Sequence, residues 1–190
     1  FESKKIEKPK RLTEMITDED IDKAVRLIKS SKKPYIFVGG GVVLADASEE
    51  LREFVEKVDA PVCDTLMGKG AYDGTSENYT GMLGMHGTKT SNLGISECDL
   101  LIAIGTRFSD RVLGNPKKFA SQAKILQFDV DPAEINKNIR VTESVVGDVK
   151  EVLKRMNQKL EQLDHNSWKE HVLAYAKTFP LTYNKEGLSG

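Results

Sequence analysis

Short apolar runs of strand length alternate with segments of helical periodicity along most of the chain, and this alternation limits the possible folds. The runs are apolar at successive positions rather than at every second one, as in Leu100–Ile104. A strand that is covered by helices on both faces meets no water, so its residues are apolar throughout. The sequence therefore predicts an α/β fold, with a doubly wound parallel sheet of about five or six strands and helices on both faces.

Apolar runs and helical spacing give the approximate bounds of these elements. Strands are predicted over residues 35–38, 61–65, 100–104, 124–128 and 143–146. Helices are predicted over residues 17–30, 47–58, 88–96, 116–121, 132–136 and 149–163, and again around Trp168. We expect one domain over residues 14–178, with linker-like charged or polar segments at 1–13 and 179–190.

Composition excludes several classes of protein. The 190 residues hold 28 Lys and Arg against 29 Asp and Glu, so the chain lacks the excess positive charge of a nucleic-acid-binding protein. No apolar run approaches the roughly 20 residues of a membrane span, and no signal peptide opens the sequence, so we expect a cytoplasmic protein. Cys63 and Cys98 lie within or beside apolar runs and are too far apart in the sequence to form a CxxC motif, and the chain has only three histidines. We interpret both as small buried hydrophobic residues and expect no metal site.

Residues that could bind a ligand follow the predicted strands, where parallel sheets place their ligands. Gly39, Gly40 and Gly41 follow the first strand, and without Cβ atoms they let a phosphate approach the backbone N–H groups at the start of a helix. The third glycine of a dinucleotide-binding G-x-G-x-x-G motif is absent, since Leu44 stands there. A tight turn explains the three glycines equally well.

The segment 80–88 combines glycines with methionines and one histidine before a predicted helix. Methionine side chains on a loop can form a deformable apolar bed for a flat ring. The alternative for Met82, Leu83 and Met85 is core packing. His86 could donate a hydrogen bond to a ligand or to a backbone carbonyl.

A further loop carries Arg107 and Arg111 on either side of Asp110. Guanidinium groups suit phosphate, carboxylate and aromatic rings. The alternative is a salt bridge between Asp110 and one arginine that only orders the loop.

Acidic residues end the next two predicted strands. Asp129 stands where an acid can hold ribose hydroxyls. Asp131 and Asp148 precede helical segments, and helix capping explains both of them.

Taken together, these segments resemble the central domain of the catalytic subunit of acetolactate synthase, also called acetohydroxyacid synthase. The resemblance covers about the whole chain, and GMLGMHGT with G-x-R-F-x-D-R is its most specific part. The matching segments are GGG at 39–41, DTLMGKGAY at 64–72, GMLGMHGT at 81–88, GTRFSDRVLG at 105–114, FDVDPAEINKN at 128–138 and GD at 147–148.

The resemblance implies a Rossmann-like central domain of a thiamine-diphosphate enzyme. The parent enzyme would decarboxylate pyruvate and condense the fragment with a second pyruvate or 2-ketobutyrate, in branched-chain amino-acid biosynthesis. It would be a homo-oligomer, with a possible regulatory subunit and with thiamine diphosphate and Mg²⁺ held by flanking domains. The central domain would bind FAD, which does no net redox chemistry in the main reaction.

Transferred onto this sequence, the family's FAD contacts would fall on Gly39, Gly40, Gly41, Thr65, Leu66, Met67, Leu83, Gly84, Met85, His86, Gly105, Arg107, Arg111, Val112, Asp129, Val130, Gly147 and Asp148. One departure is Ser109, where the family usually has an acid.

Two features of the family are not found in the sequence. These are the G-D-G string with a later Asn that would hold magnesium diphosphate, and the domain that supplies the cofactor-activating glutamate. We therefore expect a chain that binds FAD without catalysis and has no catalytic residues of its own. The alternatives are the central domain of another thiamine-diphosphate-dependent 2-keto acid enzyme, a nicotinamide-binding dehydrogenase domain, or a structural spacer domain.

Overall fold

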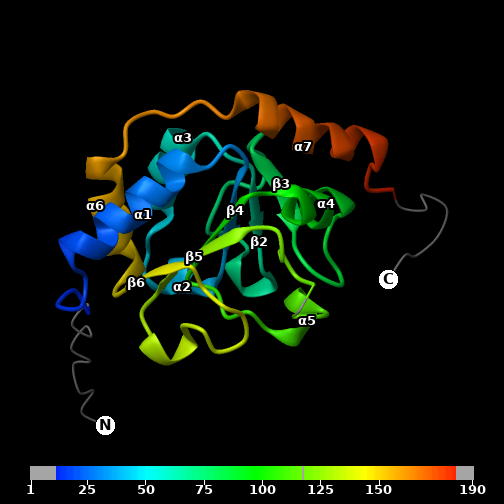
Figure 1. The fold of residues 1–190 in the computed structure, drawn as a ribbon. Coiled ribbons are helices and arrows are strands. Elements are labelled where there is room, and N and C mark those ends of the chain that lie inside the picture. The colour runs from blue at the N-terminus through cyan, green and yellow to red at the C-terminus, as the bar shows by residue number, and fades with distance from the viewer. Residues whose placement is uncertain (1–11, 117, 183–190) are drawn as a thin grey trace, which may run out of the picture.

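The computed structural model describes residues 12–116 and 118–182, and six parallel strands form its centre (Figure 1). The strands are β1 Pro34–Val38, β2 Val62–Asp64, β3 Tyr79–Met82, β4 Leu100–Ile104, β5 Lys124–Asp129 and β6 Glu143–Val146. Their order in the sheet is β3-β2-β1-β4-β5-β6. The chain thus winds outward from β1 in one direction and from β4 in the other, which confirms the predicted doubly wound fold.

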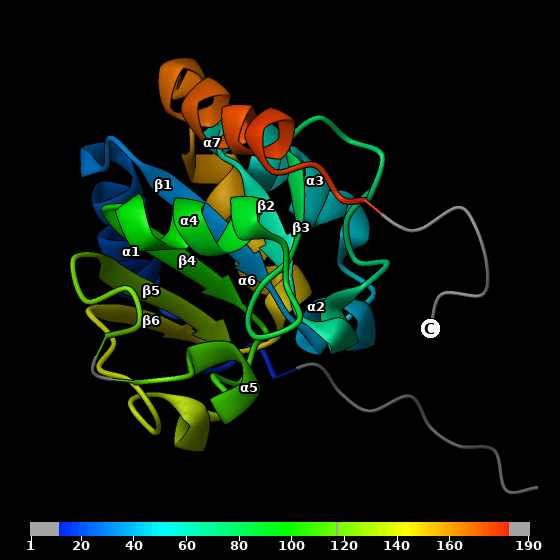
Figure 2. The same cartoon turned by 90° about the vertical axis from the view of Figure 1, so that its right-hand side faces the viewer.

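Helices cover both faces of this sheet. They are α1 Asp18–Ser30, α2 Gly40–Leu44, α3 Ser48–Val58, α4 Lys89–Glu97, α5 Asp110–Leu113, α6 Val149–Lys159 and α7 Asn166–Thr178, with 3₁₀ turns η1 Leu66–Gly68 and η2 Pro132–Glu134. Helices α1, α3 and α6 pack on one face, and α4 and α7 pack on the other. Figure 2 shows α4 in front of the sheet and α6 behind it.

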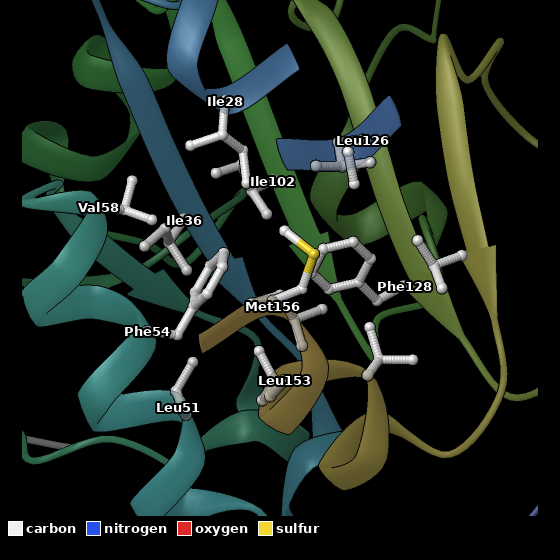
Figure 3. Packing of buried hydrophobic residues seen from close by; sticks show 14 of the residues in the cluster. Ile28, Ile36, Leu51, Phe54, Val58, Ile102, Leu126, Phe128, Leu153 and Met156 are labelled. Carbon is white, nitrogen blue, oxygen red and sulfur yellow. The ribbon is translucent and has the colours of Figure 1, made fainter. Parts of the chain in front are cut away.

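The core divides at the sheet because successive strand residues point to opposite faces. In β1, Ile36 and Val38 join the cluster under α1, α3 and α6, whereas Tyr35 and Phe37 join the cluster under α4 and α7. All four side chains are fully buried, which explains why the run is continuously apolar. Figure 3 shows the first of these clusters, with Phe54 and Met156 directed toward the strands.

Capping side chains fix where several helices begin. The Thr17 hydroxyl accepts a hydrogen bond from Asp20 N at 3.1 Å, and the Asp148 carboxylate accepts one from Glu151 N at 3.2 Å. Asp131 likewise accepts from Ala133 N at 2.9 Å and begins η2. The predicted capping roles of Asp131 and Asp148 are therefore confirmed.

Three predicted elements differ from the structure. The helix expected over 116–121 is wrong: the described part of this segment forms turns, and Ala120 has a left-handed φ of 44° that no α-helix continues through. The segment 132–136 forms a single 3₁₀ turn rather than a longer helix. The helix expected over 149–163 ends at Lys159, because Leu160 is extended while its side chain stays buried.

The strand β3 was not predicted. It lies at the edge of the sheet, and its residues Tyr, Thr, Gly and Met form no apolar run. Gly81 within it has a φ of 100°, which few other residues adopt.

The longest helices, α1 and α7, have 13 residues each. Within the described residues, none of the helices has the length and apolar character needed to cross a membrane. The predicted linkers fall mostly outside the described residues, which leave out 1–11 and 183–190.

Candidate functional site

All six strands end on one side of the sheet, which we call the carboxyl edge, defined by the residues at and just after the ends of β1 to β6. In Figure 1 this edge is the lower side of the molecule, where α2 and α5 lie. Each residue predicted to contact a ligand lies at this edge or in the loop that follows its strand. They are Gly39, Gly40, Gly41, Thr65, Leu66, Met67, Leu83, Gly84, Met85, His86, Gly105, Arg107, Arg111, Val112, Asp129, Val130, Gly147 and Asp148.

The glycines after β1 pack directly against the loop after β4. Gly39 N donates to Ile104 O and Gly41 N donates to Gly105 O, both at 2.9 Å. A Cβ on Gly41 would lie 2.7 Å from the Gly105 Cα, and one on Gly39 would overlap the Gly105 carbonyl oxygen. Tight packing therefore requires Gly39 and Gly41, and their N–H groups are already bonded to the protein. Of the three glycines predicted to let a phosphate approach the backbone, Gly39 and Gly41 thus have a packing role as well, and the phosphate contact stays a prediction.

We expect Gly41→Ala to lower the free energy of unfolding by about 1–3 kcal/mol, because the added methyl group overpacks the contact between the two loops. Gly74→Ala is the matched control, since its Cβ would meet only the Tyr79 ring at 3.8 Å. Urea unfolding of both variants measures the difference. Equal stability of the two variants would show that the loops yield easily to a side chain.

Gly40 instead faces the loop after β2. A Cβ there would lie 3.1 Å from the Met67 Cβ, so the two loops touch. The side chains of Leu66 and Met67 are 68% and 76% exposed, while the Thr65 hydroxyl accepts a hydrogen bond from Gly68 N at 3.0 Å. Two large apolar side chains thus stand in solvent beside Gly40.

The loop after β3 is tied to α5. Met85 N donates to Arg111 O at 3.1 Å, and Gly84, with a φ of 105°, would bring a Cβ to 2.6 Å from that same oxygen. Leu83 is buried, so core packing is its role, whereas Met85 is 74% exposed and His86 is also exposed. The structure therefore brings Gly84 and Met85 against Arg111 and Val112, whereas Leu83 is buried in the core.

Arg107 lies after β4 with its side chain 77% exposed. Its Nε is 3.7 Å from the Glu134 carboxylate, which also accepts a hydrogen bond from Lys137 at 2.8 Å. Among the described residues, Asp110 forms no ion pair with Arg107 or Arg111. The alternative prediction of a salt bridge between Asp110 and one of these arginines is therefore wrong, and Arg107 pairs with Glu134 instead. Glu134 is buried and keeps its pair with Lys137, whereas Arg107 is largely exposed, so Arg107 can turn to another anion without leaving Glu134 unpaired.

Asp129 ends β5 with only 7% of its surface exposed. Its Oδ1 accepts a hydrogen bond from Asp131 N at 3.0 Å, and its Oδ2 lies 3.5 Å from Gln127 Nε2. Burial raises the pKa of Asp129 above its ordinary value, and the nearby Glu134 and Asp131 carboxylates add to this. No cation among the described residues pairs with Asp129 to offset the cost. A buried carboxylate held at such a cost is typical of a functional site.

Thr106 and Gln127 were not predicted as site residues. Both are fully buried near this edge, and neither the Thr106 Oγ1 nor the Gln127 Oε1 has a hydrogen-bond partner in the part of the chain that the structure describes. Only their position, next to strand ends, distinguishes them in the sequence. Unpaired buried polar atoms call for a partner from outside the described chain.

Asp129→Asn should raise stability relative to wild type at about pH 7 but not at about pH 3. A folded-state pKa above the unfolded value means that the ionised carboxyl destabilises the protein, and this cost sets in as the pH rises through the unfolded pKa. Urea unfolding at both pH values measures it, with Asp110→Asn, at an exposed residue of α5, as the control. A variant that differs from wild type by the same amount at both pH values contradicts the assignment.

The cysteines offer no chemistry at this edge. Cys63 and Cys98 are free and buried, and burial raises the pKa of the Cys98 thiol to about 12. The prediction that both are small buried hydrophobic residues is confirmed. Across the described ranges, no group of three His, Cys, Asp or Glu side chains is placed to hold a metal ion.

Comparison with known proteins agrees with this architecture. The family described as "Thiamine pyrophosphate enzyme, central domain" matches residues 21–156. The chain is 49% identical over 160 residues to the "Probable acetolactate synthase large subunit" of Methanocaldococcus jannaschii, covering 83% of this chain and 27% of that protein.

Two further relatives have similar names. The "Acetolactate synthase large subunit" of Corynebacterium glutamicum is 44% identical over 171 residues, which cover 87% of this chain and 27% of that protein. The "Acetolactate synthase, chloroplastic" of Arabidopsis thaliana is 44% identical over 176 residues, which cover 90% of this chain and 26% of that protein. The chain thus spans about a quarter of the length of these relatives. On the sheet order and the family match together, this chain belongs to the family of thiamine pyrophosphate enzyme central domains and is similar to the acetolactate synthase large subunits.

Proposed function

We propose that the carboxyl edge binds FAD and that the chain serves as the FAD-binding central domain of an acetolactate synthase. The observation that carries the proposal is the composition of this edge. Exposed apolar side chains, an exposed arginine and a buried carboxylate that has no cation partner among the described residues stand around one set of loops. The similarity to acetolactate synthase large subunits supports the same assignment.

The edge residues fit the parts of a flavin dinucleotide. Met67 and Met85 offer exposed thioether side chains to a flat aromatic ring. Arg107 can form a forked contact with a phosphate, since its side chain is 77% exposed and its pair with Glu134 is long, at 3.7 Å. Asp129 can accept hydrogen bonds from ribose hydroxyls, which would compensate its burial.

The role of these residues is to bind and orient, not to carry out bond chemistry. In the proposed enzyme, thiamine diphosphate with Mg²⁺ would supply the decarboxylation and condensation chemistry on pyruvate and a second 2-keto acid. FAD would take no net part in redox. We propose that the chain alone forms no acetolactate, and that residues 14–178 are the extent of the FAD domain.

The remaining expectations about the parent protein are proposals of the same kind. They are a homo-oligomer, flanking thiamine-diphosphate-binding domains, a possible regulatory subunit and a place in the cytoplasm. The Arabidopsis thaliana relative is named as chloroplastic, so location can differ within the family.

Arg107→Lys tests the proposal, because it keeps the charge and removes the planar fork. Loss of one charge-assisted hydrogen bond should weaken FAD binding about ten- to a hundredfold. Flavin fluorescence titration gives the affinity, and thermal melting without flavin should stay unchanged because the side chain is 77% exposed.

The control is Arg26→Lys on α1, an exposed arginine on an element that does not contribute to the carboxyl edge. NADH titrated in place of FAD distinguishes a dehydrogenase domain. Equal FAD affinity for Arg107→Lys and wild type would remove Arg107 from the site. NADH binding in preference to FAD would overturn the proposed function.

A further inference from the structure

Three side chains meet at the base of the loop after β2. Asp64 is the last residue of β2 and Lys69 follows η1, so the two residues flank the loop 65–68. Lys69 Nζ lies 3.5 Å from Asp64 Oδ1, which joins the two ends of the loop. Tyr79, on the neighbouring strand β3, donates its hydroxyl proton to Asp64 Oδ2 at 2.8 Å and accepts a hydrogen bond from Lys69 at 3.1 Å. We call these three residues the loop clamp.

The charges and protons of the loop clamp are consistent with this geometry. Asp64 is only 4% exposed, and its Oδ1 has no hydrogen-bond partner among the described residues, so the Lys69 ammonium offsets its charge. Burial raises the pKa of Tyr79, so the hydroxyl keeps the proton that it donates to Asp64. The hydrogen bond to Tyr79 in turn raises the pKa of Lys69. A buried carboxylate that loses its cation is costly, which favours the closed arrangement.

The loop held in this way carries residues proposed to contact FAD. Leu66 and Met67 are largely exposed to solvent, and covering such side chains would be favourable. The backbone beneath them is closely packed, because a Cβ on Gly68 would overlap the Val38 carbonyl oxygen. Met67 also lies against Gly40 across the sheet edge. A shift at the base of the loop would therefore move Met67 relative to the glycines after β1.

We propose that Asp64, Lys69 and Tyr79 are positioning residues that hold the loop 65–68 in the conformation that binds flavin. The role rests on the proposed function for its ligand, and it assigns no contact with the flavin to the loop clamp. Without the clamp the loop samples other conformations. The apparent affinity for FAD is then the intrinsic affinity multiplied by the fraction of molecules whose loop is in the binding conformation. Asp64 is buried but Lys69 is half exposed, so the pair contributes little to stability, and its role here is to hold the geometry of the loop.

Lys69→Met and Tyr79→Phe open the loop clamp from its two sides. The Lys69 side chain is 49% exposed, so its replacement should leave the fold intact, which far-UV circular dichroism checks. We expect faster amide exchange at residues 65–68 and about tenfold weaker FAD binding in both variants. Lys69→Arg, which keeps the charge, should restore most of both.

The matched control is Lys23→Met, which removes a lysine that is 37% exposed and paired with Glu19 at 2.8 Å on α1. It should leave loop exchange and FAD affinity at wild-type values. Unchanged exchange at 65–68 in Lys69→Met and Tyr79→Phe would overturn the clamp, and so would faster exchange with unchanged FAD affinity. If the wild-type chain binds no FAD at all, the proposed function fails and this role fails with it. Wild-type binding with equal affinity in both variants overturns the clamp alone.

Discussion

The contact between the loops after β1 and β4 is the constraint on which the rest of the site depends. These two strands pair in parallel along five residues each, yet the chain leaves them toward opposite halves of the sheet. The backbones can approach at this point only because Gly39, Gly41 and Gly105 carry no side chains. The strand order of this doubly wound sheet reverses between β1 and β4, which is where such sheets bind their ligands, and the glycine contact lies at that point.

The carboxyl edge combines features that are unfavourable for stability but useful for binding. Met67 and Met85 expose apolar surface, and Asp129 is buried without a cation among the described residues. The amino ends of the strands carry no such costs at Trp168, whose indole N–H donates a hydrogen bond to Pro34 O at 2.9 Å at the start of β1. Helix α7, which contains Trp168, packs on α4. A ligand or a neighbouring domain that covered Met67, Met85 and Asp129 would offset these costs.

Sequence patterns predicted the strands that carry apolar runs, including the half-buried edge strand β6 with its two successive valines, and missed β3, whose residues form no such run. Every residue of β1 and β4 is buried, so their apolar runs were recognisable, whereas the edge strand β3 is mostly half-buried. Leu160 and Leu163 continue the helical spacing of α6, but an extended segment carries them, with Leu160 buried and Leu163 partly buried. Periodicity alone cannot distinguish this segment from a longer helix. The residues that follow the predicted strands could be placed at one edge of the sheet, because parallel strands all end at the same edge.

Side-chain partners could not be predicted in the same way. Arg107 pairs with Glu134 from η2 rather than with its sequence neighbour Asp110, and this depends on how the loops after β4 and β5 lie beside each other. The loop clamp joins Asp64 and Lys69 with Tyr79 of the unpredicted β3, so sequence reasoning had no basis for finding it. Gly39 and Gly41 were singled out for a phosphate, and the structure gives them a packing role first.

The most direct test of the account is a map of backbone amide chemical shifts of the wild-type chain as FAD is added. We predict that the perturbed amides follow the strand ends, at Gly40, Met67, Met85, Arg107 and Val130, while those of α1 and α7 stay unchanged. Shifts confined to α1, α7 or the amino ends of the strands, or no shifts at saturating FAD, would contradict the claim that the carboxyl edge is a flavin site.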